Sequence, residues 1–277
     1  MTPRSSFTHA IRAKAQPIWD GEMKHPFVRG LGDGTLPIER FRFYLAQDYV
    51  FLIEYCRVFA LAAAKARDLP TLGIFTRLLD ETLNGEMQLH RDYCERLGIA
   101  ETDLEATTPA PITHAYTRHL LTVAYSGSLA DIVAAVLPCQ LGYAGIATAL
   151  AGEGRGGANS HYTEWIKTYS SPQFVAGAER LRGLLDDLTA GWPARELAPL
   201  ETLFLTSSRY EYLFWEMAWT QSSWPVCGLE GSLLLEPNSH ESERCRCWTR
   251  DQARGGHAFW SGEVVESPTC FGEEATG

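Results

Sequence analysis

A cysteine that follows a proline is the residue of this sequence best suited to covalent chemistry. Cys139 directly follows Pro138 in an apolar, helix-like stretch, where a proline removes a backbone hydrogen bond and kinks the helix at a cost of about 3 kcal/mol. Tyr143 lies four residues later, on the same helical face. A thiol aimed into a pocket beside a phenol is a candidate nucleophile once it ionises. The alternative is a buried structural cysteine beside a core tyrosine.

Two carboxylates stand among aromatic residues. Glu211 is followed by Phe214 three residues on, and a buried carboxylic acid in such a setting can keep its proton and act as a general acid. The alternative is an exposed glutamate on an amphipathic helix. Asp48 lies in mid-helix, where aspartate has poor propensity, with Phe51 about one turn on. Such an acid either faces solvent or is held for a polar ligand.

A weaker pattern joins Glu86 and His90, which are spaced one helical turn apart. They could be two metal ligands, although a charge pair or a capped, buried histidine is commoner at this spacing. A two-metal oxidase site on a helical scaffold needs several histidines and acids on facing helices. The histidines without an evident partner pattern are His9, His25, His114 and His119. We therefore predict no metal and no cofactor.

The elements that must position these residues are helices. From Phe7 to about Trp224 apolar residues recur at intervals of three and four, and Gly and Pro fall mainly between the periodic blocks. No stretch shows the period-two alternation of a strand. The clearest of these periodic blocks are residues 37–66, 70–97, 113–125, 129–150, 162–169, 173–189 and 194–219. The sequence predicts an all-α fold of roughly eight or nine helices.

The end of the chain has another composition. Residues 226–277 contain no lysine, nine acidic residues, four arginines, seven glycines and four of the seven cysteines. Cys245 and Cys247 lack the C-x2-C spacing of a zinc site. We predict a helical catalytic domain over residues 1–225 and a disordered appendage over 226–277.

Charge and hydropathy limit the partners. With 24 basic and 34 acidic residues the formal net charge is −10, which argues against nucleic acid or an anionic membrane as a partner. No run approaches the 18 or more apolar residues of a membrane span, and the start of the chain lacks the apolar region of a secretory signal. The odd number of cysteines fits a reducing compartment. We therefore expect a cytoplasmic protein.

Taken in order, these segments resemble the TenA/thiaminase II family. The matching pieces are Phe43-Tyr44-x-x-Gln47-Asp48, Glu86-x-x-x-His90, Leu137-Pro138-Cys139 with Tyr143, Trp165-Ile166-x-x-Tyr169 and Ser208-x-Tyr210-Glu211-x-x-Phe214-Trp215. The resemblance covers residues 7 to 225 and implies a heme oxygenase-like multi-helix bundle, assembled as a homotetramer, with neither heme nor metal. It also implies a thiamin salvage hydrolase, because members with the cysteine hydrolyse 4-amino-5-aminomethyl-2-methylpyrimidine to hydroxymethyl-pyrimidine and cleave thiamin.

The resemblance also implies roles for individual residues. Cys139 would be the nucleophile that adds to the pyrimidine ring, Asp48 would bind the ring nitrogen and the 4-amino group, and Glu211 would shuttle protons. Phe51 would stack on the ring. The remaining walls of the substrate pocket would be Tyr116, Tyr143, Tyr169 and Phe214. The chemistry is consistent, since an electron-poor ring needs a soft nucleophile, an acid and a carboxylate that pairs with its N–C–NH2 edge.

Two departures from the family pattern carry expectations. Phe51 lacks the hydroxyl that a tyrosine there could offer to the cysteine, which bears on the rate. Gln140 and Gly142 replace bulkier aromatic residues and would widen the pocket. Two other functions stay open: a metal-dependent oxidase on the same scaffold, and a non-catalytic pyrimidine-binding or regulatory protein in which Cys139→Ser changes nothing.

Overall fold

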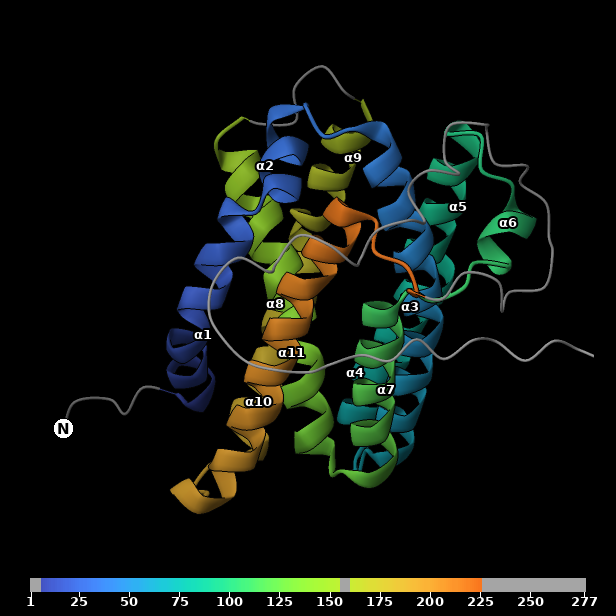
Figure 1. Ribbon diagram of the computed structural model, residues 1–277. Helices are drawn as coiled ribbons and strands as arrows, with labels where there is room; N and C mark the ends of the chain where they lie inside the picture. Colours follow the sequence, from blue (N-terminus) through green and yellow to red (C-terminus); the bar gives the residue numbers. More distant parts are fainter. Residues whose placement is uncertain (1–5, 155–159, 226–277) are drawn as a thin grey trace, which may run out of the picture. The chain divides into compact units, whose positions relative to one another are not determined.

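The computed structural model describes residues 6–154 and 160–225, and within these ranges the regular structure is entirely helical (Figure 1). The predicted all-α fold is therefore confirmed. The predicted appendage, residues 226–277, lies outside the described residues. The helices are α1 (Phe7–Lys24), α2 (Pro26–Asp33), α3 (Ile38–Lys65), α4 (Leu69–Asp80), η1 (Glu81–Glu86), α5 (Met87–Arg96), α6 (Glu101–Glu105), α7 (Pro111–Ser126), α8 (Leu129–Gly152), α9 (Ser160–Tyr169), α10 (Pro172–Leu188) and α11 (Ala194–Thr220).

The described residues form more helices than the eight or nine expected. The short helix α6 lies between two predicted blocks, and two local features separate other helices. His25 precedes Pro26 and is held in an extended conformation, with ψ at 136°, as residues before a proline usually are. Its ring accepts a hydrogen bond from Phe27 N, so it ends α1 and caps α2. The block predicted as one helix over 70–97 contains the π-helical turn η1 between α4 and α5, and such turns are frequent at functional sites.

Helix α8 forms the centre of the bundle. It starts in a capping box, in which the side chains of Ser128 and Asp131 each accept a hydrogen bond from the other's backbone N–H, and it packs against α7, α9, α10 and α11. The expectation that no run approaches the length of a membrane span is wrong for this helix: among the described helices it alone is long and apolar enough by length and composition. However, 78% of its most apolar window is buried inside the protein. Its apolar surface is covered by neighbouring helices.

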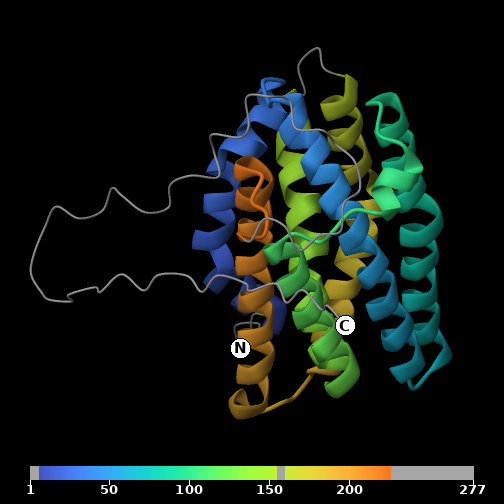
Figure 2. The same cartoon turned by 45° about the vertical axis from the view of Figure 1, so that its right-hand side comes forward.

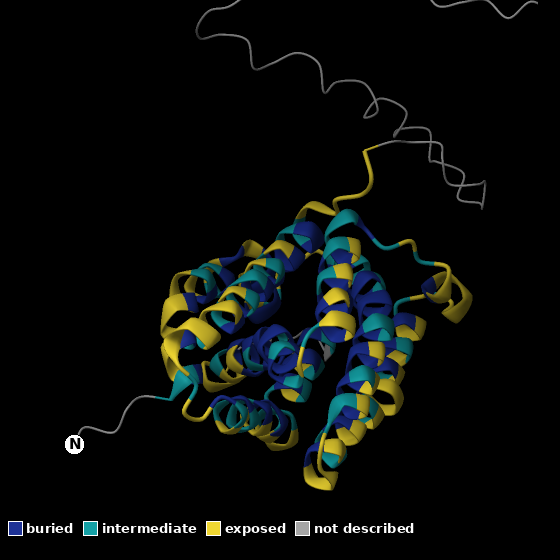
Figure 3. Ribbon diagram, turned by 90° about the horizontal axis from the view of Figure 1, so that it is seen from below, coloured by how far each residue is buried: buried dark blue, intermediate teal, exposed yellow. Residues whose placement is uncertain are grey.

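The long helices lie side by side, with their buried residues turned inwards (Figures 2 and 3). Four of them, α3, α7, α8 and α11, form the group that matters for the site, because each contacts the other three. Asp48 lies on α3, Tyr116 on α7, Cys139 on α8 and Glu211 on α11. Residues up to 163 positions apart in the sequence are thereby brought to one interior.

Candidate active site

The thiol of Cys139 lies half-buried on α8, one residue after Pro138 within the helix. Burial raises its pKa well above the ordinary value, and the negative charges of Glu211, Glu86 and Asp48 act in the same direction. The neighbouring Tyr55 hydroxyl acts in the opposite direction and lowers the pKa. The resting thiol is therefore protonated, and it needs a change in its surroundings before it can attack.

Glu211 is a buried carboxylic acid next to this thiol. It is 4% exposed, so the alternative of an exposed glutamate is wrong. Tyr116 donates a hydrogen bond of 2.5 Å to Glu211 Oε1. Burial raises the Glu211 pKa to about 8, although the hydrogen bond from Tyr116 and the neighbouring Cys139 thiol lower it. At neutral pH the group is mostly the neutral acid, which is the state a proton donor needs.

Asp48 is buried too, at 4% exposure, so it does not face solvent. Its Oδ2 accepts a hydrogen bond from the Tyr44 hydroxyl at 3.1 Å and lies 2.8 Å from His90 Nε2. The same Tyr44 hydroxyl lies 3.2 Å from the Tyr143 hydroxyl and accepts a hydrogen bond of 3.1 Å from Trp165 Nε1. One oxygen of the carboxylate is thus fixed by its neighbours, and the carboxyl group has a defined orientation.

Glu86 and His90 do not act as a side-chain pair. His90 Nδ1 lies 2.9 Å from the backbone oxygen of Glu86, and its Nε2 bonds to Asp48, so both ring nitrogens are engaged. The Glu86 side chain instead accepts a hydrogen bond of 2.7 Å from the Tyr169 hydroxyl. Burial and the charge of Asp48 raise the Glu86 pKa to about 7. In the part of the chain that the structure describes, no group of three or more His, Cys, Asp or Glu is arranged to hold a metal ion.

The predicted aromatic residues lie in two contacting groups. Phe51 is 5.1 Å from Tyr116 and 5.8 Å from Phe214 between ring centroids, beside Glu211. The ring centroids of Tyr143 and Tyr169 are 5.0 Å apart, and this pair of rings lies beside Asp48 and Glu86. The structure therefore brings every predicted site residue into one cluster of side chains.

Three further residues of this cluster were not predicted as site residues. Tyr44 and His90 hold Asp48, and the Tyr55 hydroxyl, which acts on the Cys139 pKa, donates to the Val136 carbonyl at 3.2 Å. Tyr55 follows Phe51 by one helical turn, and this spacing could have suggested that it shares the face of Phe51 and Asp48. The contact of His90 with Asp48 spans 42 residues, and nothing in the local spacing indicates it.

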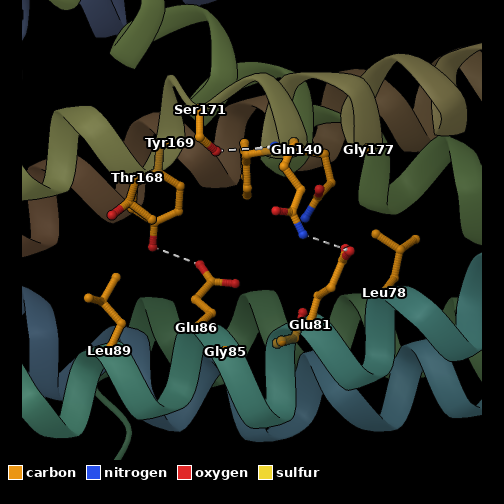
Figure 4. A pocket seen from close by; sticks show the side chains of 13 residues that line it. Leu78, Glu81, Gly85, Glu86, Leu89, Gln140, Thr168, Tyr169, Ser171 and Gly177 are labelled. Atoms are coloured by element: carbon orange, nitrogen blue, oxygen red, sulfur yellow. Dashed lines mark hydrogen bonds between the residues drawn. The ribbon is translucent and has the colours of Figure 1, made fainter.

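An open cavity of about 330 Å³ lies beside the cluster (Figure 4). Glu86 and Tyr169 point towards each other across it, and Gln140, next to Cys139 in the chain, lines it as well. Of the predicted site residues Tyr169 alone lines this cavity, while Cys139, Asp48 and Glu211 do not. The hydrogen-bonded pair of Tyr169 and Glu86 therefore belongs both to the cavity wall and to the edge of the cluster.

Comparison with known proteins places these features in a family. Residues 12–221 match the TENA/THI-4/PQQC family. The chain is 48% identical to an aminopyrimidine aminohydrolase of Halalkalibacterium halodurans over 225 residues, which cover 80% of this chain and 100% of that protein. The crystal structure of a TenA family transcription regulator from Silicibacter sp. TM1040 shares 36% identity, with a TM-score of 0.72 over 79% of this chain and 98% of that one.

A more distant structure supports the fold alone. A domain of unknown function from Shewanella denitrificans, described as having a heme oxygenase-like fold, is 14% identical, with a TM-score of 0.63 over 77% of this chain and 92% of that one. The predicted heme oxygenase-like bundle is confirmed.

Proposed function

Because this chain belongs to the TENA/THI-4/PQQC family, we propose that it is an aminopyrimidine aminohydrolase of thiamin salvage. It converts 4-amino-5-aminomethyl-2-methylpyrimidine to the hydroxymethyl compound, and it cleaves thiamin in the same way. The observation that carries the proposal is the convergence of Cys139, Glu211 and Asp48 from three helices into one cluster. The relative from Halalkalibacterium halodurans bears the name of this activity.

Asp48 binds the pyrimidine in this proposal. Tyr44 and His90 both bond to its Oδ2, which holds the carboxylate in place for the N–C–NH2 edge of the ring. Paired, charge-assisted hydrogen bonds to such an edge fix both position and orientation. The contacting rings of Phe51, Tyr116 and Phe214 offer stacking surfaces for the bound ring.

Cys139 and Glu211 carry out the reaction. The sulfur forms a bond to a ring carbon, and the thiol proton passes through Glu211 to a ring nitrogen. The electron pair returning from the ring then expels the amine, which takes a proton from the Glu211 acid and leaves as ammonia. Water forms the new C–O bond and returns a proton to Glu211. The S–C bond then breaks, and the ring nitrogen returns its proton to the sulfur, which restores the ring and the thiol. Covalent catalysis divides a difficult displacement into two easier steps.

The test measures turnover of both substrates by wild type and by Cys139→Ala, with the pyrimidine product detected by chromatography. We expect turnover to be abolished in the variant while binding of the pyrimidine persists. Cys56→Ala is the control, because Cys56 is a buried cysteine on α3 outside the cluster. Unimpaired hydrolysis by Cys139→Ala would refute the mechanism.

A second candidate function is a non-catalytic regulator, since the relative from Silicibacter is described as a transcription regulator. That function predicts that Cys139→Ser leaves the behaviour of the protein unchanged. The formal net charge of −10 disfavours direct contact with nucleic acid. The oxidase alternative is disfavoured by His90, whose two ring nitrogens are already engaged. A stoichiometric metal in the purified protein would revive it.

We further propose that the protein works as a homotetramer in the cytoplasm and has no nucleic-acid or membrane partner. The support is the family membership together with the acidic charge. Light scattering on the purified chain tests the tetramer.

A further inference from the structure

A carboxyl group outside the predicted site is buried in the same interior. Glu22, on α1, is 1% exposed. Within the described ranges its Oε1 is shielded from solvent and has no hydrogen-bond partner. An unpartnered buried polar atom costs about 1–3 kcal/mol of stability, so a carboxyl left in this state calls for a reason other than folding.

The position of Glu22 relates it to the reacting groups. A Cβ atom placed on Gly142 would lie 3.9 Å from Glu22 Oε2, so the bare backbone of α8 faces this carboxyl. Gly142 follows Cys139 by three residues and therefore shares its side of the helix. Helix α1 also packs against α11, and the charge of Glu211 acts directly on Glu22. Glu22 thus lies next to the face of α8 that carries Cys139 and next to Glu211, the proposed acid.

The charges around Glu22 leave it without a counter-ion of its own. Burial raises its pKa to about 9, the charge of Glu211 adds to the rise, and Arg12 opposes it. Arg12 itself donates to Gln16 at 2.7 Å and lies over the Trp19 ring at 3.4 Å. Because the pKa of Glu211 is raised to about 8 and that of Glu22 to about 9, the interior holds two neutral acids at pH 7. A cation entering beside them would favour ionisation of a carboxyl and gain an ion pair in a buried setting.

We propose that Glu22 is a binding residue for the aminomethyl group of the substrate, which takes its proton from Glu211 and is then held as an ammonium group by the two carboxyls. The inference rests on the proposed function, in which Glu211 serves the departing amine and the second carboxyl lies beside it. A primary ammonium group carries three donors and one positive charge, and an unpartnered carboxyl oxygen suits it. The hydroxymethyl product has no such charge, so the same pair of acids favours the substrate over the product.

The test compares an amine with an alcohol in the Glu22→Gln variant of the full chain. KM is measured for the aminomethyl-pyrimidine, and the inhibition constant is measured for the hydroxymethyl-pyrimidine. Loss of a charge-assisted contact should raise KM by about tenfold or more and leave the inhibition constant within about twofold. Asp20→Asn is the matched control, because Asp20 is an exposed acid on the same helix. An unchanged KM, or an equal change in both constants, overturns the proposal.

A second variant separates binding from folding. Glu22→Leu removes the unpartnered carboxyl from a buried site, so it should keep or raise the melting temperature while losing the preference for the amine. A lowered melting temperature with the preference retained would assign Glu22 a structural role instead. The two proposals fail differently, because normal turnover by Cys139→Ala refutes the mechanism, whereas a normal Glu22→Gln with an inactive Cys139→Ala refutes only this assignment.

Discussion

His90 Nε2 lies 2.8 Å from Asp48 Oδ2, and both residues are buried, at 1% and 4% exposure. The contact joins α5 to α3, so the carboxylate that we propose binds the substrate is oriented by a residue from another helix. The backbone oxygen of Glu86 fixes the other side of the imidazole ring at 2.9 Å. His90 is therefore a positioning residue that acts through Asp48.

Removing this support should weaken substrate binding more than it slows chemistry. In His90→Gln the Asp48 carboxylate loses a charge-assisted hydrogen bond, a contact whose loss costs about 1.5–3 kcal/mol. We expect KM for the aminopyrimidine to rise by about tenfold, with kcat changed much less. Steady-state kinetics check this, with the exposed His9→Gln as control. A fall in kcat at constant KM would contradict a role through Asp48.

The same pair gives stability a pH dependence. Burial alone would lower the His90 pKa, but the hydrogen bond and charge of Asp48 outweigh it, and the pKa is raised above the ordinary value. A raised histidine pKa contributes stability that is complete below the unfolded value of about 6.5 and is lost as pH rises through the folded value. The melting temperature of wild type should therefore exceed that of His90→Gln most at acid pH. A melting-temperature difference between wild type and His90→Gln that grows as the pH rises would contradict a raised His90 pKa.

Tyr116 should set the alkaline limit of activity through Glu211. With the Glu211 pKa near 8, the proton-donating form is lost above about that pH, and kcat/KM should fall there. The Tyr116 hydrogen bond lowers this pKa, so Tyr116→Phe should move the alkaline limb to higher pH. A pH–rate profile of kcat/KM for both proteins measures the shift. If the alkaline limb of kcat/KM lies at the same pH in both proteins, the limb belongs to a group other than Glu211.

Tyr55 should assist ionisation of the nucleophile. The Tyr55 hydroxyl acts to lower the Cys139 pKa against the effect of burial, so Tyr55→Phe should slow alkylation of the thiol by iodoacetamide at neutral pH and reduce kcat/KM severalfold. The control is Tyr125→Phe, because Tyr125 is 69% exposed on α7. Alkylation at the wild-type rate would show that the hydroxyl does not act on the thiol.

The helices were predictable because their signals are local. Pro111 in the first turn of α7, the Ser128 cap and the apolar period of three and four all lie within a few residues of the elements they specify. Two boundaries have no signal in the apolar pattern. The ring of His25 caps α2 and separates it from α1, and the π-turn Glu81–Glu86 lies inside the block predicted as one helix over residues 70–97.

The sequence indicated candidate residues that the structure brings into one cluster, but it did not indicate the contacts between them. Cys139, Asp48 and Glu211 stood out as types that are unusual in their local surroundings, but a spacing rule cannot say that Asp48 meets His90 or that Glu211 meets Tyr116. These contacts depend on how α3, α5, α7 and α11 pack. Glu22 carried no local signal at all, because a glutamate on an amphipathic helix is usually exposed, and its burial is visible only in the packed bundle.

The catalytic domain should function without residues 226–277. The last described contact is made by Trp224, whose Nε1 donates to the Pro109 carbonyl at 2.9 Å and whose ring lies 6.0 Å from that of His114. A chain ending at Pro225 keeps this contact, so its kcat/KM and melting temperature should match those of the full chain. A chain ending at Gln221 loses it, and because Trp224 is 46% exposed we expect a fall of only about 2–4 °C. Calorimetry and the product assay measure both truncations, and lost activity in the chain ending at Pro225 would assign the omitted residues a catalytic role.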